Sequence, residues 1–145
     1  HAIGLSHSGW RGTVARMGKC TLEAMHNAFG TEASDVYCAI GPSICQDCYE
    51  VSEDVAEQFR AAFPEHHMID EILHAKGGGK YQLDLWEANR HILLDAGVEP
   101  SHLQITDICT CCNPDHLFSH RYTGGRRGNL GAFLMVEDRS SWLIK

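Results

Sequence analysis

Residues 7–12, with the sequence HSGWRG, place a histidine, a tryptophan and an arginine in one glycine-flanked turn. The turn follows an apolar run at 2–5, which predicts a short buried strand, and precedes an amphipathic helix that begins near Thr13. Glycines allow tight backbone conformations, and the start of a helix offers unpaired N–H groups to an anion. The segment therefore predicts a compact polar site. The alternative is an ordinary turn whose tryptophan packs on the core while the histidine and arginine face water.

A second candidate is the loop at 41–51, which leaves a predicted strand and enters a predicted helix. In α/β proteins ligands commonly bind where strands end and helices begin. Cys48 lies near the helix start, which favours a thiolate and so predicts a nucleophile or a soft-metal ligand. His66 and His67 follow that helix directly. With His7 and Cys48, one of this pair could complete a zinc site with an open fourth position, although a solvated loop is the alternative for the pair.

The seven cysteines form two clusters and two single positions: Cys45 and Cys48, then Cys109, Cys111 and Cys112, and finally Cys20 and Cys38. Because no secretory feature is visible, we expect thiols or metal ligands and not disulfides. One alternative is a four-thiolate structural zinc that joins two residues from each cluster, although the C-x-C-C spacing is not that of a zinc ribbon. The C-x-x-C of the first cluster lacks the context of a thioredoxin-like motif. The two single cysteines lie in predicted core elements, where cysteine behaves as a small hydrophobe.

Charged residues elsewhere add candidates of lower specificity. Arg121 could clamp a phosphate or a carboxylate bidentately, or it could form a surface salt bridge. Three aspartates are acid/base candidates: Asp84, Asp107 and Asp115. No spacing singles out a pair of them, and each could equally cap a helix or form a turn.

The elements that position these residues alternate between strand and helix along the chain. Apolar residues at helical spacing predict helices over 13–29, 53–63 and 83–96. Apolar runs predict strands over 2–5, 36–40, 103–108 and 131–136. The glycines at 77–79 are expected to form a flexible loop without the pattern of a phosphate-binding P-loop. Strands separated by helices predict an α/β domain, a layered sheet with flanking helices.

Length and charge restrict the possible partners. The 145 residues fit one domain over 1–145, and the net charge of -7 argues against general nucleic-acid affinity. No apolar run approaches the roughly 18 to 20 residues of a membrane span, and no signal peptide is visible, so we expect no membrane partner and a cytoplasmic protein. Because the chain begins at His1, directly in a predicted strand, we expect an upstream segment to be missing. The sequence does not specify an oligomeric state.

Four segments, in the right order, resemble the signatures of one known family. Residues 7–12 are similar to its H-A-G-W-R-G motif, with serine in place of alanine. The loop at 41–51 is similar to G-P-x-I-G-P-x-C-Y-E-V, but has Cys-Gln-Asp at 45–47 where the family has Gly-Pro and a variable residue. Residues 83–98 are similar to L-D-L followed by A-G-V, and 109–121 to C-T followed by F-F-S-x-R. The chain thus resembles the laccase-domain, or multi-copper polyphenol oxidoreductase, family.

The resemblance implies an enzyme with purine nucleoside phosphorylase, adenosine deaminase and methylthioadenosine phosphorylase activities. A metal ion, zinc or alternatively copper, is implied at His7, Cys48 and a histidine after the next helix, where His66 is favoured over His67. A metal-bound water with a near-neutral pKa would explain deamination at the same site.

The implied substrates are a purine nucleoside and phosphate, which attacks the anomeric carbon of the sugar as the base departs. Arg11 and Arg121 are candidates to hold the phosphate, and Asp84 and His120 are candidates to protonate the purine. Two other classes of function stay open. One is a copper-dependent phenol oxidase, although the chain lacks the several His-x-His pairs of a multi-copper oxidase. The other is a binding module with a structural metal or redox-sensitive thiols.

Overall fold

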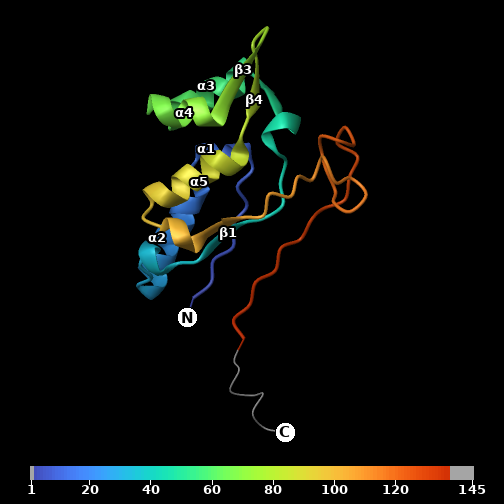
Figure 1. Cartoon of the computed structure of the whole chain (residues 1–145). Helices are drawn as coiled ribbons and strands as arrows, with labels where there is room; N and C mark the ends of the chain where they lie inside the picture. Colours follow the sequence, from blue (N-terminus) through green and yellow to red (C-terminus); the bar gives the residue numbers. More distant parts are fainter. Residues whose placement is uncertain (1, 138–145) are drawn as a thin grey trace.

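A computed structural model describes residues 2–137 of the chain, with the backbone alone at 66 and 67. In Figure 1 the helices gather on the left of the view, and the chain that follows the last strand runs along the right. Five α-helices lie in the described range: α1 (Trp10–Val14), α2 (Met17–Phe29), α3 (Glu53–Ala62), α4 (His66–Ile72) and α5 (Leu85–Asp95). No helix among these is long and apolar enough to cross a membrane.

Five short strands form two small sheets in the same range: β1 (Cys38–Ile40), β2 (Glu50–Ser52), β3 (Leu73–Gly77), β4 (Lys80–Leu83) and β5 (Leu103–Ile105). β1 and β5 pair in parallel, with Ala39 opposite Gln104. β4 lies between β2 and β3 in an antiparallel sheet. The predicted α/β class is confirmed, with two sheets in place of one layered sheet.

The core lies where α3 and α5 pack against the antiparallel sheet. Phe59, Phe63, Ile72, Leu83 and Ile92 are its largest fully buried apolar side chains. The two phenylalanine rings stack with centroids 6.0 Å apart, because they lie four residues apart at the C-terminal end of α3. Each such side chain contributes about 1.5 to 3 kcal/mol through burial. The predicted buried stripe of this helix is therefore confirmed.

The predicted helix over 13–29 is interrupted, which corrects the expectation of one continuous helix. Arg16 adopts the left-handed conformation, with φ at 54°, between α1 and α2. Its guanidinium forms an ion pair with Asp95 at 2.7 Å and donates to the carbonyl of Ala62 at 3.3 Å. These contacts offset a backbone strain of about 1 to 2 kcal/mol. The break allows Gly18 on α2 to approach α5, where an added Cβ would lie 3.1 Å from Leu93 Cδ2.

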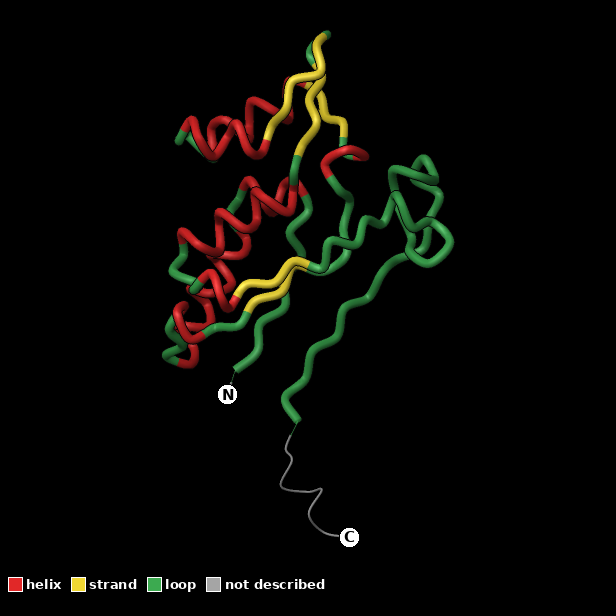
Figure 2. Tube along the Cα trace, viewed as in Figure 1, coloured by secondary structure: helices red, strands yellow, loops and turns green. Residues whose placement is uncertain are grey.

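Two of the predicted strands do not form. Residues 2–5 form no strand, and Ile3 and Leu5 are 42% and 60% exposed. Residues 131–136 are likewise extended without strand pairing, and Phe133 is 96% exposed. A strand needs a hydrogen-bonded neighbour, and the described residues provide none for either segment. Figure 2 shows that the described chain beyond β5 contains neither helix nor strand.

The glycine run at 77–79 forms the turn of a β-hairpin, although only a flexible loop was expected. All three glycines have positive φ, between 60° and 90°, which glycine adopts without a steric penalty. The strands on either side of this turn were not predicted from the sequence, because β3 is mostly exposed and lacks an alternating apolar face. The hairpin matters for the site because β4 pairs with β2, which begins two residues after Cys48.

Candidate functional site

Both cysteine clusters lie beyond the carboxyl ends of the parallel strands β1 and β5. The pairing of the strands continues past their ends, because Ser43 N–H donates to the carbonyl of Ile108 at 3.2 Å. Thr110 N–H then donates to the carbonyl of Ser43 at 3.0 Å. Parallel strands leave a sheet at the same edge, so the two loops stay adjacent after the pairing ends. This topology brings together residues that lie far apart in the sequence.

Four cysteines meet at this edge, and we call them the thiol cluster: Cys45, Cys48, Cys109 and Cys112. Their Sγ atoms all lie within 4.8 Å of one another. The Sγ atom of Cys112 lies 3.5 Å from that of Cys48 and 3.9 Å from that of Cys45. The Sγ atom of Cys109 accepts hydrogen bonds from the backbone N–H groups of Cys45 at 3.3 Å and Cys112 at 3.4 Å. The four-thiolate alternative from the sequence therefore has a geometric counterpart.

The thiols of this cluster differ in acidity. Burial raises the pKa of Cys109, but the two backbone N–H donors and the neighbouring thiols outweigh it and lower the pKa to about 7. Burial raises the pKa of Cys48 well above its ordinary value, and hydrogen bonds with the neighbouring thiols raise it further. Cys48 lies in a 3₁₀ turn (Gln46–Cys48) before β2 and not at the start of α3. The expectation that Cys48 lies near the start of a helix is therefore wrong.

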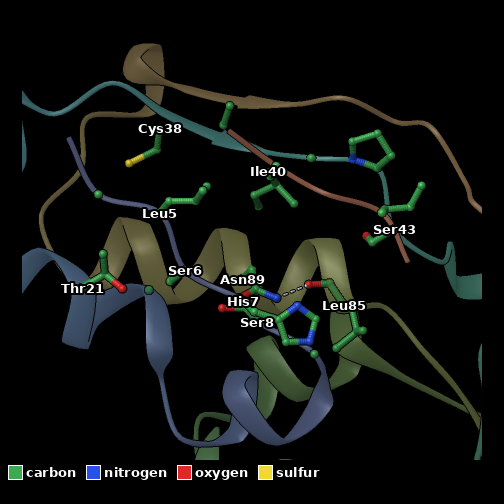
Figure 3. A pocket seen from close by; sticks show the side chains of 18 of the residues that line it. Leu5, Ser6, His7, Ser8, Thr21, Cys38, Ile40, Ser43, Leu85 and Asn89 are labelled. Atoms are coloured by element: carbon green, nitrogen blue, oxygen red, sulfur yellow. Dashed lines mark hydrogen bonds between the residues drawn. The ribbon is translucent and has the colours of Figure 1, made fainter. Parts of the chain in front are cut away.

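A large cleft lies beside the cluster, with a volume of about 1910 Å³. Its lining includes His7, Tyr49, Asn89, Thr110 and Arg121. In the view of Figure 3 the ring of His7 lies beside Asn89 and Leu85 of α5, and Ile40 and Ser43 form the opposite wall. A ligand pocket usually measures about 300 to 1,000 Å³, so a small molecule would fill one end of this cleft.

The charges of two arginines, Arg121 and Arg11, act on Tyr49. The guanidinium of Arg121 lies 5.1 Å from the centroid of the Tyr49 ring, and its Nη1 donates to the backbone carbonyl of Glu50 at 2.8 Å. Burial raises the pKa of Tyr49 overall, while the charges of Arg121 and Arg11 act to lower it. Arg11 also stacks on Trp10, with its guanidinium 4.2 Å from the ring centroid. Two guanidinium groups therefore act on one half-buried phenol.

The turn at 7–12 is fixed to α5 by buried polar contacts. Thr13 is fully buried, and its hydroxyl bonds with the carbonyls of Ser8 and Gly9 at 3.2 and 3.1 Å. Asn89 donates to the Thr13 hydroxyl at 3.1 Å and to the carbonyl of Leu85 at 2.8 Å. Trp10 packs against the core, as the alternative for this turn anticipated. The turn therefore combines a packed tryptophan with a histidine that lines the cleft.

The sequence-predicted candidates are brought together in part. His7, Arg121 and His120 line the cleft, whereas Arg11 and Cys48 are not among its lining residues. The side chains of His66 and His67 lie outside the described part of the chain, and their backbone begins α4. The ligand set of His7, Cys48 and His66 or His67 thus stays a prediction.

The other candidates have structural explanations. Asp84 caps α5 by accepting a hydrogen bond from Glu87 N–H at 2.9 Å, as one of its two interpretations anticipated. Asp107 has a positive φ of 52° and Asp115 lies exposed in a turn. Cys20 is exposed, so its assignment to the core is wrong, whereas Cys38 is half-buried and burial raises its pKa.

Sequence reasoning missed Tyr49 and Asn89. Tyr49 follows a cysteine that already drew attention, and its place next to a candidate ligand was the available signal. Asn89 is a polar residue on the buried face of α5, where a polar group requires hydrogen-bond partners. No pattern in the sequence indicated that its partner would be Thr13.

The chain is similar to a known family and to several named proteins. Residues 1–137 match the family described as multi-copper polyphenol oxidoreductase laccase. A purine nucleoside phosphorylase of Bacteroides thetaiotaomicron is 38% identical over 135 residues, which cover 93% of this chain and 49% of that protein. A protein named adenosine deaminase RL5, from an unknown prokaryotic organism, is 37% identical over 126 residues, or 87% of this chain and 47% of its own. The chain spans about half the length of these relatives.

Solved structures show the same fold. The crystal structure of YlmD from Geobacillus stearothermophilus superposes with a TM-score of 0.78 at 36% identity, covering 85% of this chain and 45% of that one. The Bacillus licheniformis protein YfiH gives the same TM-score at 30% identity, covering 83% of this chain and 45% of its own. The sequence match and the shared fold lead to one conclusion: the chain belongs to the multi-copper polyphenol oxidoreductase laccase family.

Proposed function

We propose that this chain forms the phosphate- and nucleoside-binding part of a metal-dependent purine nucleoside phosphorylase, with adenosine deaminase and methylthioadenosine phosphorylase as further activities. The observation that carries the proposal is the shared cleft of His7, Tyr49 and Arg121. The names of relatives at 37% and 38% identity support this class of substrate. The net charge of -7 argues against a nucleic acid as the substrate.

The phosphate site is proposed between Arg121 and Arg11, next to the Tyr49 ring. A guanidinium presents five N–H donors in a planar fork that matches two oxygens of a phosphate. One donor of Arg121 is committed to the Glu50 carbonyl, which orients the side chain and leaves its other donors for the anion. The Tyr49 phenol can donate to the same anion, because its raised pKa keeps it protonated at neutral pH.

The proposed reaction is a displacement at the anomeric carbon of the nucleoside. An oxygen of phosphate forms a bond to C1′ while the bond from C1′ to the purine nitrogen breaks, and the base leaves with the electron pair. The leaving base must gain a proton. We assign this role to His120, which lines the cleft, in preference to Asp84, whose carboxylate caps α5.

A metal ion is proposed as the cofactor, with zinc preferred to copper. The chemistry of the donors fits a soft or borderline ion, because Cys48 lies among three further thiols and His7 lines the cleft. The family resemblance implies His7, Cys48 and His66 as ligands, with His67 as the alternative, whereas the three neighbouring thiols offer Cys48 a second set of partners. Such an ion supplies Lewis acidity and a water of lowered pKa when bound, which is the chemistry that deamination requires.

The proposal is tested by product identity. The purified protein is incubated with adenosine or inosine, with and without phosphate, and the free base, inosine and sugar phosphate are quantified. We expect base and sugar phosphate to appear together only when phosphate is present, and inosine to form from adenosine without it. Oxidation of a phenol by oxygen with copper bound, and no base release, would instead support the polyphenol oxidase alternative.

A further inference from the structure

The thiol cluster is geometrically prepared for one tetrahedral metal ion. Bonds of about 2.3 Å from zinc to four thiolates give sulfur–sulfur edges of about 3.8 Å. The sulfur of Cys112 lies 3.5 Å from that of Cys48 and 3.9 Å from that of Cys45, and all four sulfurs lie within 4.8 Å of one another. All four cysteines are free thiols, so each sulfur is available to a shared ion.

Backbone donors support the same conclusion. Cys109 Sγ accepts N–H bonds from Cys45 and from Cys112, so each loop donates one hydrogen bond to the same sulfur. Donors of this kind orient a thiolate ligand and reduce its charge in zinc sites. Cys111, which lies between two members of the cluster in sequence, also hydrogen-bonds with Cys48, but its sulfur is not one of the four that all lie within 4.8 Å of one another.

The loop that follows has little else to hold it. Residues 106–137 contain no helix or strand (Figure 2), and Phe118 and Tyr122 are 54% and 62% exposed. The same loop nevertheless places Arg121 in the cleft. A metal bound by residues of two loops restricts both, and the binding free energy then stabilises the fold.

We propose that Cys45, Cys48, Cys109 and Cys112 bind one zinc ion as a tetrathiolate, which fixes the loop carrying Arg121 against the end of the β1–β5 pair. The inference does not depend on the nucleoside chemistry proposed above. It assigns Cys48 to a different set of partners from the one that the family resemblance implies, His7 and His66 or His67. The two assignments therefore make opposite predictions.

Zinc analysis of matched variants separates them. We expect the protein purified under reducing conditions to carry zinc in the cluster. Cys109→Ser should weaken zinc binding at least tenfold, whereas Cys38→Ser, at a half-buried thiol outside the cluster, should leave zinc binding unchanged. His7→Ala should also keep the zinc. Loss of zinc in His7→Ala with retention in Cys109→Ser would overturn the inference and favour the three-ligand set.

Two measurements on the unmodified protein keep the test independent of whether a variant folds. Replacement of zinc by cobalt should give the intense sulfur-to-cobalt charge-transfer absorption of four thiolates. Alkylation followed by mass spectrometry should show that zinc protects the four cluster cysteines, while the exposed Cys20 reacts with or without zinc. Iron instead of zinc, equal reactivity of all cysteines, or a Cys48–Cys112 disulfide in the reduced preparation would each contradict the proposal.

Discussion

Arg121 is the residue at which a substitution should best distinguish the two proposed reactions, phosphorolysis and deamination. Its guanidinium is oriented by the Glu50 carbonyl and lies against Tyr49. Lysine keeps the charge but cannot form a planar two-point contact with phosphate. We expect Arg121→Lys to reduce phosphorolysis at least tenfold and deamination less than twofold, since a single lost charge-assisted hydrogen bond corresponds to about 1.5 to 3 kcal/mol. Rates with adenosine, with and without phosphate, give both numbers.

The control for this change is Arg126→Lys, because Arg126 lies in the same loop and is not among the residues that line the cleft. It should leave both activities unchanged. Equal losses of phosphorolysis and deamination in Arg121→Lys would indicate that the arginine holds the loop and does not hold the phosphate.

Cysteines at different depths should respond differently to alanine. Cys48 belongs to the thiol cluster, so Cys48→Ala should remove the bound metal and nearly all turnover. Cys20 is exposed, so Cys20→Ala should change the free energy of unfolding by less than about 0.5 kcal/mol and keep the metal. Zinc content, turnover and melting temperature of both variants check this. A Cys48→Ala protein with normal zinc and activity would exclude both ligand assignments.

Individual site residues were predicted best from the sequence where residue type and spacing determine the chemistry. The turn at 7–12 and the C-x-x-C at 45–48 were identified because histidine, arginine and cysteine are uncommon in such density. The four thiols come together because β1 pairs with β5. The spacing of the cysteines in the sequence cannot predict this contact, because the two loops lie far apart along the chain. Asn89 was missed for the same reason, since its partner Thr13 belongs to another helix.

At the level of elements, the left-handed residue between α1 and α2 offers a test of what stabilises the break. Arg16→Ala should lower the free energy of unfolding by about 1 to 2 kcal/mol, because the contacts with Asp95 and with the carbonyl of Ala62, which offset the backbone strain, are lost. Lys19→Ala removes a more exposed pair with Glu23 and should cost about 0.5 kcal/mol or less. Urea unfolding of both variants measures the difference. Equal costs would contradict the role assigned to the two contacts of Arg16.

Helix α5 should carry part of the acid sensitivity of the fold. Burial raises the pKa of Glu87, but the hydrogen bonds from Arg90 outweigh it and lower the pKa overall, with His91 beside the pair. Because the folded pKa is lower than the unfolded one, the carboxylate adds stability above its ordinary pKa of about 4.3, and this is lost as the pH falls through the folded value. Glu87→Gln should therefore flatten the acid limb of the stability curve.

Unfolding by urea at several pH values between neutrality and about pH 3 checks this expectation. Glu57→Gln, on an exposed position of α3, is the matched control and should leave the acid limb as it is. An unchanged slope in Glu87→Gln would show that its ion pair with Arg90 contributes little to the folded state.

The elements that the sequence predicted correctly have strong local signals. α3 and α5 have apolar stripes at helical spacing, and Asp84 caps α5 as one of its interpretations anticipated. The strands at 2–5 and 131–136 were predicted from apolar runs, but an apolar run is equally compatible with an extended segment that pairs with no other strand. The interruption at Arg16 has no local signal, since its causes are contacts with α3 and α5.

For the whole molecule, metal removal should separate two regions of unequal stability. The core at α3, α5 and the antiparallel sheet is held by buried apolar side chains, whereas residues 106–137 have no regular structure. A chelator should therefore raise hydrogen exchange and protease cleavage in 109–125 and leave α3 protected. Peptide-level exchange with and without chelator measures this. Equal loosening of α3 would show that the ion stabilises the entire fold.

The parallel pairing of β1 with β5 also affects the order in which parts of the chain fold. Residues 39 and 104 must meet before either cysteine-bearing loop has a neighbour, and the intervening chain includes a hairpin and three helices that form through local contacts. Closing so long a loop costs entropy before any contact can offset that cost, so such pairings form late in folding. A newly made chain therefore holds only a two-cysteine half-site until its second half has been synthesised. If the thiol cluster binds zinc as proposed, metal loading is confined to molecules whose helices have already folded.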